Sequence, residues 1–394
     1  MSSVKIGLIG KPNVGKSTLF SALTKTPVDI ANYPFTTLKP NVGIAWLATK
    51  CPESEIDKKC NPREGACVEG TRYLPVEIVD VPGLIPGASE GKGMGNEFLD
   101  NIRDSEAIIH VIDASGKTGP DGTPLLDPRD PVEDILTIES EMNEWLADRI
   151  FRDWEKFARK ADASSDRLER SIENKIASFG VSEKQISIIL TKDSFPAKLA
   201  QWQISDARRF ATMIFTHIKP IIRVANKADA ASRENIQKIQ EFDRNIFFIS
   251  GDYELTLEKA HKANIIDNLG RDFSIVGNVN PAQKNALEMI RNFLNQSHAT
   301  RIGEILSNVV RKVLGYVVVY PVADDSTWGD NKGNILPDAF LMPSGSTAIE
   351  LAFKIHSDIG EGFIRAIDCR TRRAIGKEHV IKDSEVIRVV SRTK

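Results

Sequence analysis

The sequence predicts an α/β fold built around a mostly parallel sheet. Three short apolar runs, at 4–9, 107–113 and 220–225, have the length and composition of strands that are buried on both faces. The first run ends at Gly10, and a helical pattern of apolar residues begins a few positions later. With 394 residues, the chain is long enough for two or three domains that include such a sheet.

The composition is that of an ordinary globular protein. Hydrophobic residues make up 41% and charged residues 27%, which excludes collagen-like and wholly disordered chains. The 52 basic and 54 acidic residues give a net charge of −2, so no overall field favours a nucleic acid or a membrane as partner. No apolar stretch approaches the roughly 18 residues of a membrane span. Four cysteines in this length are not a secreted disulfide framework, and we expect a soluble, cytoplasmic protein.

The segment between the first strand and the first helix reads GKPNVGKS and matches the pattern G-x-x-x-x-G-K-[ST]. Such a loop binds a polyphosphate through backbone N–H groups, because its glycines leave no Cβ in the way. Lys16 would reach the β and γ phosphates, and the Ser17 hydroxyl would be a ligand of Mg²⁺. The flanking strand and helix argue against a chance match and predict a P-loop NTPase domain. The residues predicted to contact the nucleotide here are Asn13, Val14, Gly15, Lys16, Ser17 and Thr18.

A second motif, Asn226-Lys227-Ala228-Asp229, follows the strand at 220–225 and predicts the binding site of the base. The Asp229 carboxylate can accept hydrogen bonds from both N1–H and N2–H of guanine, whereas adenine does not offer this pair of donors. Asn226 would tie this loop to the phosphate loop, and the aliphatic stem of Lys227 would cover a face of the base. In isolation the tetrad is as well explained by a polar turn, but together with the phosphate loop it predicts guanine binding.

Asp80 and Gly83 belong to a third motif, at the end of the apolar run at 74–79. An aspartate at a strand end can hold Mg²⁺ through water, and the amide of Gly83 can reach the γ-phosphate. The glycine-rich segment at 83–99 has too little side-chain packing to hold one conformation alone, as an order–disorder switch requires. Its alternative interpretation is a flexible connector.

Two threonines and a serine–glycine pair complete the predicted site. The hydroxyl of Thr36 or Thr37, in the loop after the first helix, would complete the Mg²⁺ shell and contact the γ-phosphate. Spacing alone does not choose between the two threonines. Ser250 and Gly251 follow the apolar run at 245–249, and a backbone amide there would meet the guanine carbonyl.

The order of these motifs resembles the Obg family of GTP-binding proteins, and specifically its YchF-like branch. The matching segments are GKPNVGKS, NYPFTTLKPNVG, DVPGLIPGA, IIHVIDAS, NKAD and IS. The resemblance covers nearly the whole chain and implies a translation-factor-type GTPase domain, with Thr37 rather than Thr36 as the ligand of Mg²⁺ and the γ-phosphate. Members of the branch that prefer ATP depart from N-K-x-D, so the NKAD of this chain favours GTP. The predicted Mg²⁺ ligands are Ser17, Thr37 and Asp80.

Leu84 stands where many switch GTPases carry the glutamine that orients the attacking water. We therefore expect slow hydrolysis, and the predicted catalytic residues are Lys16, Thr37 and Gly83. In place of the glutamine, the attacking water would be activated by the γ-phosphate itself, by Ser89 or Glu90, by a partner, or by a monovalent cation. Related GTPases bind potassium with an asparagine at the place of Asn13, so K⁺ is a candidate cofactor beside Mg²⁺.

The distances between the motifs along the chain require insertions, because ordinary connections in α/β units are short. Apolar residues in steps of three and four between 142 and 179 predict a helical hairpin. Helical stretches followed by alternating strands near the C-terminus predict a small mixed β-grasp module. The run ELAFKIHSDIGEGFIRA within it resembles a TGS domain, and this resemblance implies an RNA or ribosome partner. The predicted domains are a discontinuous P-loop GTPase domain (1–135 and 217–300, with a small cysteine-containing insertion at 50–72), a helical insertion (136–216), and a linker helix with a TGS-like β-grasp domain (301–394).

Cys51, Cys60 and Cys67 lie in the small insertion with the spacing C-x8-C-x6-C. Three thiolates could take a metal, but no C-x-x-C pair or neighbouring histidine completes a structural zinc site. A disulfide is a second interpretation, and ordinary free cysteines are the one we favour from the sequence.

A basic cluster near the C-terminus is explained equally well by a solvated turn and by attraction to the phosphates of an RNA. Its members are Arg365, Arg370, Arg372, Arg373 and Lys377.

The sequence thus predicts a molecular switch that binds GTP with Mg²⁺ and slowly hydrolyses it to GDP and phosphate. The expected partners are a guanine nucleotide and, through the helical and TGS-like domains, a ribosome or RNA, with no membrane. Two alternatives stay open: an RNA- or ribosome-binding protein in which the nucleotide is a structural ligand, and an ATPase of the same fold.

Overall fold

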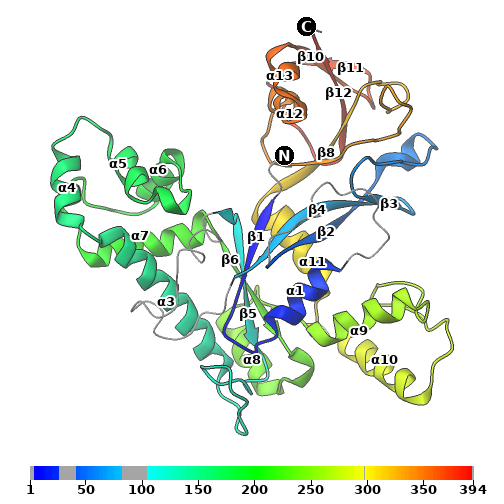
Figure 1. Ribbon diagram of the computed structural model, residues 1–394, viewed down its shortest axis with the longest axis horizontal. Helices are drawn as coiled ribbons and strands as arrows, with labels where there is room; N and C mark the ends of the chain where they lie inside the picture. The colour runs from blue at the N-terminus through cyan, green and yellow to red at the C-terminus, as the bar shows by residue number, and fades with distance from the viewer. Residues whose placement is uncertain (1–3, 26–40, 82–103, 297, 393–394) are drawn as a thin grey trace. The chain divides into compact units, whose positions relative to one another are not determined.

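The computed structural model describes residues 4–25, 41–81, 104–296 and 298–392 (Figure 1). The chain divides into two compact units. We call them the P-loop unit (Lys5–Ala22 and Ile78–Arg301) and the C-terminal unit (Met1–Val4, Leu23–Glu77 and Ile302–Lys394). None of the helices in the described ranges is long and apolar enough to cross a bilayer.

Parallel strands form the centre of the P-loop unit. They are hydrogen-bonded in the order β1 (Lys5–Ile9), β5 (Ala107–Asp113), β6 (Ile221–Asn226) and β7 (Phe247–Phe248). Every residue of β5 is buried, as expected for a strand that is covered on both faces. Because the strands are parallel, their carboxyl ends meet at one edge, where Asp113 of β5 stands beside Asn226 of β6. The last three residues of β4 (Thr71–Asp80) also belong to this unit.

Three helices beside these strands bury apolar faces in one core. They are α8 (Arg233–Phe242), α9 (Gly251–Lys262) and α10 (Pro281–Leu294), with a short 3-10 turn η5 (Ala228–Ala230) after β6. Phe248 of β7, Leu257 of α9 and Phe293 of α10 lie in the same buried cluster. Another helix, α1 (Lys16–Thr24), follows β1 and buries Leu19 and Ala22. The α10 helix starts at a capping box in which Asn280 and Gln283 bond each other's backbone N–H groups.

Helices alone build the insertion between β5 and β6. They are α3 (Pro131–Phe151), α4 (Trp154–Asp162), α5 (Leu168–Lys175), α6 (Glu183–Lys192) and α7 (Ile204–His217), with 3-10 turns η3 (Ala177–Phe179) and η4 (Leu199–Gln201). The long helices α3 and α7 pack along each other (Figure 1). Aromatic rings fill the far end, where Trp154 stacks on Trp202 at 5.5 Å between centroids. The predicted periodicity from 142 to 161 is interrupted in the structure, because Arg152 is extended and Asp153 is left-handed with φ of 54°.

The C-terminal unit contains a mixed five-stranded sheet. Its strand order is β11 (Arg373–Ile375), β10 (Phe363–Asp368), β12 (Glu385–Ser391), β8 (Tyr316–Val322) and β9 (Phe340–Pro343), and only β12 and β8 are parallel. Val319, Leu351 and Ile387 lie in a core between this sheet and α12 (Ala348–Ile355), which is followed by α13 (Ser357–Glu361). The predicted β-grasp is therefore confirmed as a separate sheet with its own core.

The rest of the C-terminal unit comes from two distant parts of the chain. One part holds β2 (Val42–Lys50), the 3-10 turn η1 (Pro52–Glu55), β3 (Ala66–Val68) and most of β4. The other begins with α11 (Ile302–Ser307), which continues as a π-helical turn over Asn308–Val313. Arg311 of this turn bonds the hydroxyl of Thr49 in β2 at 2.6 Å and the carboxylate of Asp383 at 2.9 Å.

A partly buried ion network fixes α3 against β6 in the P-loop unit. The Arg223 guanidinium binds both oxygens of Glu139 at 2.7 and 2.6 Å and also pairs with Asp243 at 2.8 Å. His110 of β5 lies 3.3 Å from the same Glu139 carboxylate. Burial alone would raise the pKa of Glu139, but the hydrogen bonds with His110 and Arg223 outweigh it and lower the pKa to about 2.

We predict that Glu139→Gln lowers the free energy of unfolding by about 2 kcal/mol at neutral pH, because it leaves the Arg223 charge only partly paired. A carboxylate with a lowered folded pKa stabilises the fold above its unfolded pKa of 4.5 and loses this effect as the pH falls through about 2. The difference between the parent and the variant should therefore shrink over that range. Urea unfolding followed by tryptophan fluorescence at several pH values measures it.

The matched control is Glu155→Gln, because the Glu155 ion pair with Arg159 is 88% and 79% exposed and should contribute little. A constant difference between parent and Glu139→Gln from pH 7 to pH 2 would contradict the assignment.

Candidate functional site

The phosphate loop connects β1 to α1 at the carboxyl edge of the sheet. Gly15 has a φ of +89°, and a Cβ there would lie 2.2 Å from Nδ2 of Asn226, so only glycine fits. The N–H of Leu19 donates to the carbonyl of Gly15 at 2.9 Å and is the first intrahelical bond of α1. The amides of the preceding turn therefore have no partner within the helix, and a helix end of this kind binds anions.

Lys16 and Asp80 meet at this loop. The Lys16 amine pairs with the carboxylate of Asp80, the last residue of β4, and donates to the Val81 carbonyl at 2.8 Å. Ser17 lines the adjoining cavity. The other predicted ligands and catalytic residues, Thr36, Thr37, Gly83, Leu84, Ser89 and Glu90, lie outside the described residues.

Asn226 joins the phosphate loop to the first residue of α9. Its Nδ2 donates to the Val14 carbonyl at 3.0 Å, and its Oδ1 accepts from the Gly251 N–H at 2.9 Å. The side chain is buried, so both ends of the amide are satisfied where water has little access. The predicted tie between the two loops is thus present as hydrogen bonds.

Lys227 also contacts the phosphate loop. Its backbone is left-handed with φ of 57°, and its amine donates to the Asn13 carbonyl at 2.8 Å. The amine also bonds the Thr118 hydroxyl and the Asp113 carboxylate, both at 3.0 Å.

The Asp113 carboxyl is fully buried at the end of β5. Burial would raise its pKa, but hydrogen bonds from Ser115 and Thr118, followed by the charge of Lys227, outweigh burial and lower the pKa. Asp113 therefore stays charged and holds the amine of Lys227 in place.

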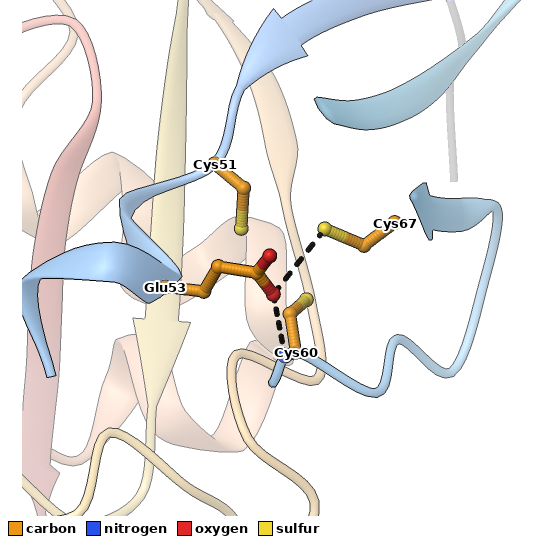
Figure 2. A group of neighbouring side chains, drawn as sticks. All are labelled: Cys51, Glu53, Cys60 and Cys67. Carbon is orange, nitrogen blue, oxygen red and sulfur yellow. Dashed lines mark hydrogen bonds between the residues drawn. The ribbon is translucent and has the colours of Figure 1, made fainter. Parts of the chain in front are cut away.

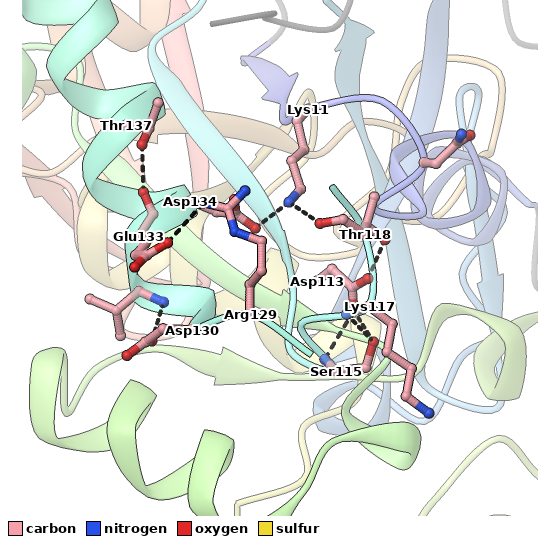
Figure 3. Close-up of polar contacts among 12 residues, drawn as sticks. Lys11, Asp113, Ser115, Lys117, Thr118, Arg129, Asp130, Glu133, Asp134 and Thr137 are labelled. Carbon is pink, nitrogen blue, oxygen red and sulfur yellow. Dashed lines mark hydrogen bonds and ion pairs between the residues drawn. The ribbon is translucent and has the colours of Figure 1, made fainter. Parts of the chain in front are cut away.

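Lys11 connects the phosphate loop to the helical insertion (Figure 3). Its buried amine pairs with Asp134 in the first turns of α3 and donates to the Thr118 carbonyl at 2.6 Å. Burial raises the pKa of Asp134 despite this pair. Analysis of the sequence missed these residues, and the one available signal was Asp113, a polar residue at the carboxyl end of a buried, mostly apolar strand.

One cavity of about 550 Å³ brings most of the predicted site together. The residues that line it are Lys11, Pro12, Asn13, Gly15, Lys16, Ser17, Thr18, Asn226, Lys227, Asp229, Ala230, Ser250, Gly251 and Asp252. Lys16 and Asp229 therefore face a common space although they are far apart in sequence. Among the residues that the structure describes, none donates a hydrogen bond to the exposed Asp229 carboxylate, which leaves it available as an acceptor.

Ser250 and Gly251 begin α9 at the wall of this cavity. The Ser250 hydroxyl caps the helix by accepting from the Tyr253 N–H at 3.4 Å. Because the Gly251 N–H already donates to Asn226, the amide of Asp252 is the next donor of this turn that can serve a ligand. Asp252 was not predicted from the sequence.

The basic cluster of the C-terminal unit is only partly available to a ligand. Arg370 binds both carboxylate oxygens of Glu55 at 2.6 and 2.7 Å and lies over the Trp328 ring. The remaining members are exposed and are Arg365, Arg372, Arg373 and Lys377.

Comparison with known families agrees with this geometry. Residues 5–151 match the 50S ribosome-binding GTPase family. Residues 224–324 match the Obg-like GTPase YGR210-like, G4 motif-containing domain, and residues 332–391 match the TGS domain. The predicted combination of a P-loop GTPase domain with a C-terminal TGS domain is confirmed.

Relatives match over nearly the full length. A GTP-binding protein of Methanocaldococcus jannaschii is 41% identical over 395 residues, which cover 99% of each chain. The ribosome-binding ATPase YchF of Buchnera aphidicola subsp. Schizaphis graminum is 30% identical, with 92% of this chain and 87% of the relative covered. The crystal structure of a GTP binding protein from Pyrococcus horikoshii OT3 has a TM-score of 0.79 at 33% identity and covers 98% of this chain and 100% of its own. The chain therefore belongs to the YchF-like branch of the Obg family of GTP-binding proteins.

Proposed function

We propose that this protein binds GTP with Mg²⁺, hydrolyses it slowly to GDP and phosphate, and acts as a molecular switch. The observation that carries the proposal is the single cavity that both Lys16 and Asp229 line, with Asn226 bonded to both walls. A nucleoside triphosphate has its phosphates at one end and its base at the other. The cavity offers the N–H groups of the loop and the Lys16 amine to the phosphates, and the Asp229 carboxylate to the base.

Guanine is the base that this carboxylate favours. Asp229 is an acceptor without a donor in the described part of the chain, and guanine supplies two donors side by side. Against adenine the same carboxylate would gain no such pair of bonds. ATP stays the alternative substrate, because relatives in the family carry the name ribosome-binding ATPase.

The described residues also fit Mg²⁺. Ser17, which lines the cavity, and Asp80, which pairs with Lys16 beside it, supply the hard oxygen atoms that this ion prefers, and Thr37 is the third proposed ligand. When bound, the ion would neutralise charge on the β and γ phosphates. Lys16 would hold the same phosphates, and the Gly83 amide is proposed to contact the γ-phosphate.

Slow hydrolysis follows from Leu84, which cannot orient a water molecule. K⁺ is the proposed helper, bound by Asn13. The Nδ2 of Asn13 donates to the Gly122 carbonyl at 2.9 Å. The side-chain oxygen of Asn13 is therefore the atom of this amide that can bind K⁺.

A ribosome is the proposed partner. Relatives are named ribosome-binding, and the TGS-like sheet presents the exposed side chains of Arg372 and Arg373. Such a partner would place the protein in the cytoplasm. The competing function is a ribosome- or RNA-binding protein in which the nucleotide is a structural ligand.

We predict that Asp229→Asn weakens GTP binding by roughly 100-fold to 10,000-fold, because two hydrogen bonds to a charged acceptor are lost. The same change should favour xanthosine triphosphate, whose carbonyl can accept from the new amide. Competition of GTP, ATP and xanthosine triphosphate against a fluorescent nucleotide measures both effects. The control is Asp166→Asn, an exposed aspartate of the helical insertion that should leave all three affinities unchanged. Tight GTP binding by Asp229→Asn would defeat the guanine assignment, and a parent preference for ATP would favour the ATPase.

Ribosomes should accelerate phosphate release from GTP by at least about tenfold if the protein is a switch that reports to them. The measurement compares the full chain with and without ribosomes from the same organism. Lys16→Ala is the negative control, because loss of the amine should remove most phosphate affinity. Binding of the chain to ribosomes without any release of phosphate would favour the structural-ligand alternative.

Phosphate release should be faster in potassium than in sodium buffer of equal ionic strength. Asn13 has a φ of 63°, which glycine adopts without strain, so Asn13→Gly removes the proposed ligand while it keeps the backbone conformation. This variant should lose the preference for potassium. Equal rates of the parent in the two buffers would rule out the cation.

A further inference from the structure

Four potential metal ligands converge in the small insertion of the C-terminal unit (Figure 2). Their ligand atoms all lie within 4.8 Å of one another. We call this group the Cys3Glu cluster, and its members are Cys51, Glu53, Cys60 and Cys67. Cys51 follows β2, Glu53 lies on the η1 turn, and Cys67 belongs to β3, so one short stretch of chain folds back to bring them together.

The carboxylate of Glu53 already lies among the thiols. It accepts the backbone N–H of Cys60 at 2.6 Å and the thiol of Cys67 at 3.6 Å, as the dashed lines in Figure 2 show. Cys51 is buried and the other members are half-buried, so the group is neither a solvated acidic patch nor a set of scattered thiols.

The spacing of the ligand atoms suits a small tetrahedral ion. With Zn–S bonds of about 2.3 Å, neighbouring sulfur atoms of a tetrahedral site lie about 3.8 Å apart. The limit of 4.8 Å means that each pair of ligand atoms needs to approach by at most about an ångström. Rotation of the side chains supplies a movement of that size without a change in the backbone.

A buried arginine provides an independent indication of negative charge. Arg72 is 1% exposed, and its Nη1 donates to the sulfur of Cys60 at 2.9 Å and to the Leu336 carbonyl at 3.0 Å. The Asp338 carboxylate is close enough to interact with the charge of Arg72, but it pairs directly with Arg63, and the Nε of Arg72 has no hydrogen-bond partner. The direct hydrogen bonds of this buried guanidinium go to carbonyls and to a sulfur, so a thiolate at Cys60 would compensate its charge better than a neutral thiol.

We propose that the Cys3Glu cluster binds one Zn²⁺ ion as a structural site. Three thiolates and one carboxylate around a divalent cation carry a net charge of −2, which Arg72 partly neutralises. Thiolate ligands in a closed, four-coordinate set select zinc over Mg²⁺ or Ca²⁺, and with four protein ligands no position is left open for catalysis.

The ion would stiffen a segment that has little regular structure. Between β2 and β3 the chain forms only the four-residue η1 turn and then a loop. That loop packs on the segment before β9, where the N–H groups of Asn61 and Arg63 donate to the carbonyls of Ile335 and Pro337 at 3.1 and 2.9 Å. Zinc would therefore hold the insertion in the shape that supports one flank of the TGS-like sheet.

The first test uses the purified full chain and the metal alone. Stripped of metal under reducing conditions and titrated with Co²⁺, the protein should take up one equivalent and develop the intense visible bands of tetrahedral cobalt with thiolate ligands. Added Zn²⁺ should displace the cobalt and protect three of the four cysteines from a thiol reagent. Failure to bind, weak bands of octahedral cobalt, or an intrachain disulfide found by mass spectrometry would overturn the proposal.

Variants then assign the ligands. Cys60→Ser should lower zinc affinity by more than about tenfold, because mutation of a residue that only contacts a ligand already lowers metal affinity by that factor. Glu53→Gln should also weaken binding, and unchanged affinity would remove the carboxylate from the site. Cys369→Ser is the matched control, because Cys369 is a buried free thiol of the same unit that is not part of the cluster.

A folding defect of the C-terminal unit is distinguished from loss of the site by near-UV circular dichroism and by urea unfolding of the full chain, because nucleotide binding reports on the P-loop unit alone. Cys60→Ser that keeps the parent's near-UV spectrum and cooperative unfolding but does not bind zinc supports the proposal, and Cys60→Ser that keeps the parent's zinc affinity contradicts it. If the variant does not fold, the cobalt titration of the parent chain still decides the question.

Discussion

The two hydrogen bonds of the Asn226 side chain are the constraint on which the rest of the nucleotide site depends. They hold the phosphate loop at Val14 and the start of α9 at Gly251 at fixed distances from the end of β6. Because β6 pairs in parallel with β5, the amide is held at the carboxyl edge of the sheet. The same amide leaves no room for a side chain at Gly15. Each unmade bond of such a buried amide would cost about 1–3 kcal/mol, so the phosphate and base ends of the cavity are positioned as one piece.

The three lysines around the cavity differ in the carboxylates with which they pair, and these partners indicate what each lysine does. Lys11 and Lys227 are bound by the protein itself, through Asp134 and Asp113, and so they shape the loop. Lys16 instead meets Asp80, and both are proposed to bind the phosphates and their ion. These pairs explain why three lysines can gather around one cavity without strong mutual repulsion, because each of them lies beside a carboxylate of the fold.

The parts of the fold and site that follow from local chemistry could be predicted from the sequence. Glycines, a lysine and a serine at fixed spacing between a strand and a helix indicate a phosphate-binding loop, and the NKAD tetrad indicates a contact with the base. The pairing of Asp113 and Asp134 with these lysines could not be predicted, because a lysine can pair with any carboxylate that the tertiary fold brings close. The helix break at Asp153 was missed for a related reason: apolar residues keep their spacing on both sides of it, since Trp154 returns to the buried face.

The Cys3Glu cluster shows the same limit in a metal site. A sequence pattern for zinc is recognised by its cysteines and histidines, and the insertion has three such residues where a structural site needs four. The structure supplies the fourth from Glu53, because a 3-10 turn directly after β2 directs its carboxylate toward the thiols of Cys60 and Cys67. Glutamates are common on turns, so spacing alone carries no signal. What distinguishes this one is the buried Arg72, which donates to the sulfur of Cys60, since a cation in that position favours a negatively charged cluster. Charge compensation across a fold, rather than ligand spacing along a chain, is therefore the evidence that separates a metal site from three ordinary cysteines.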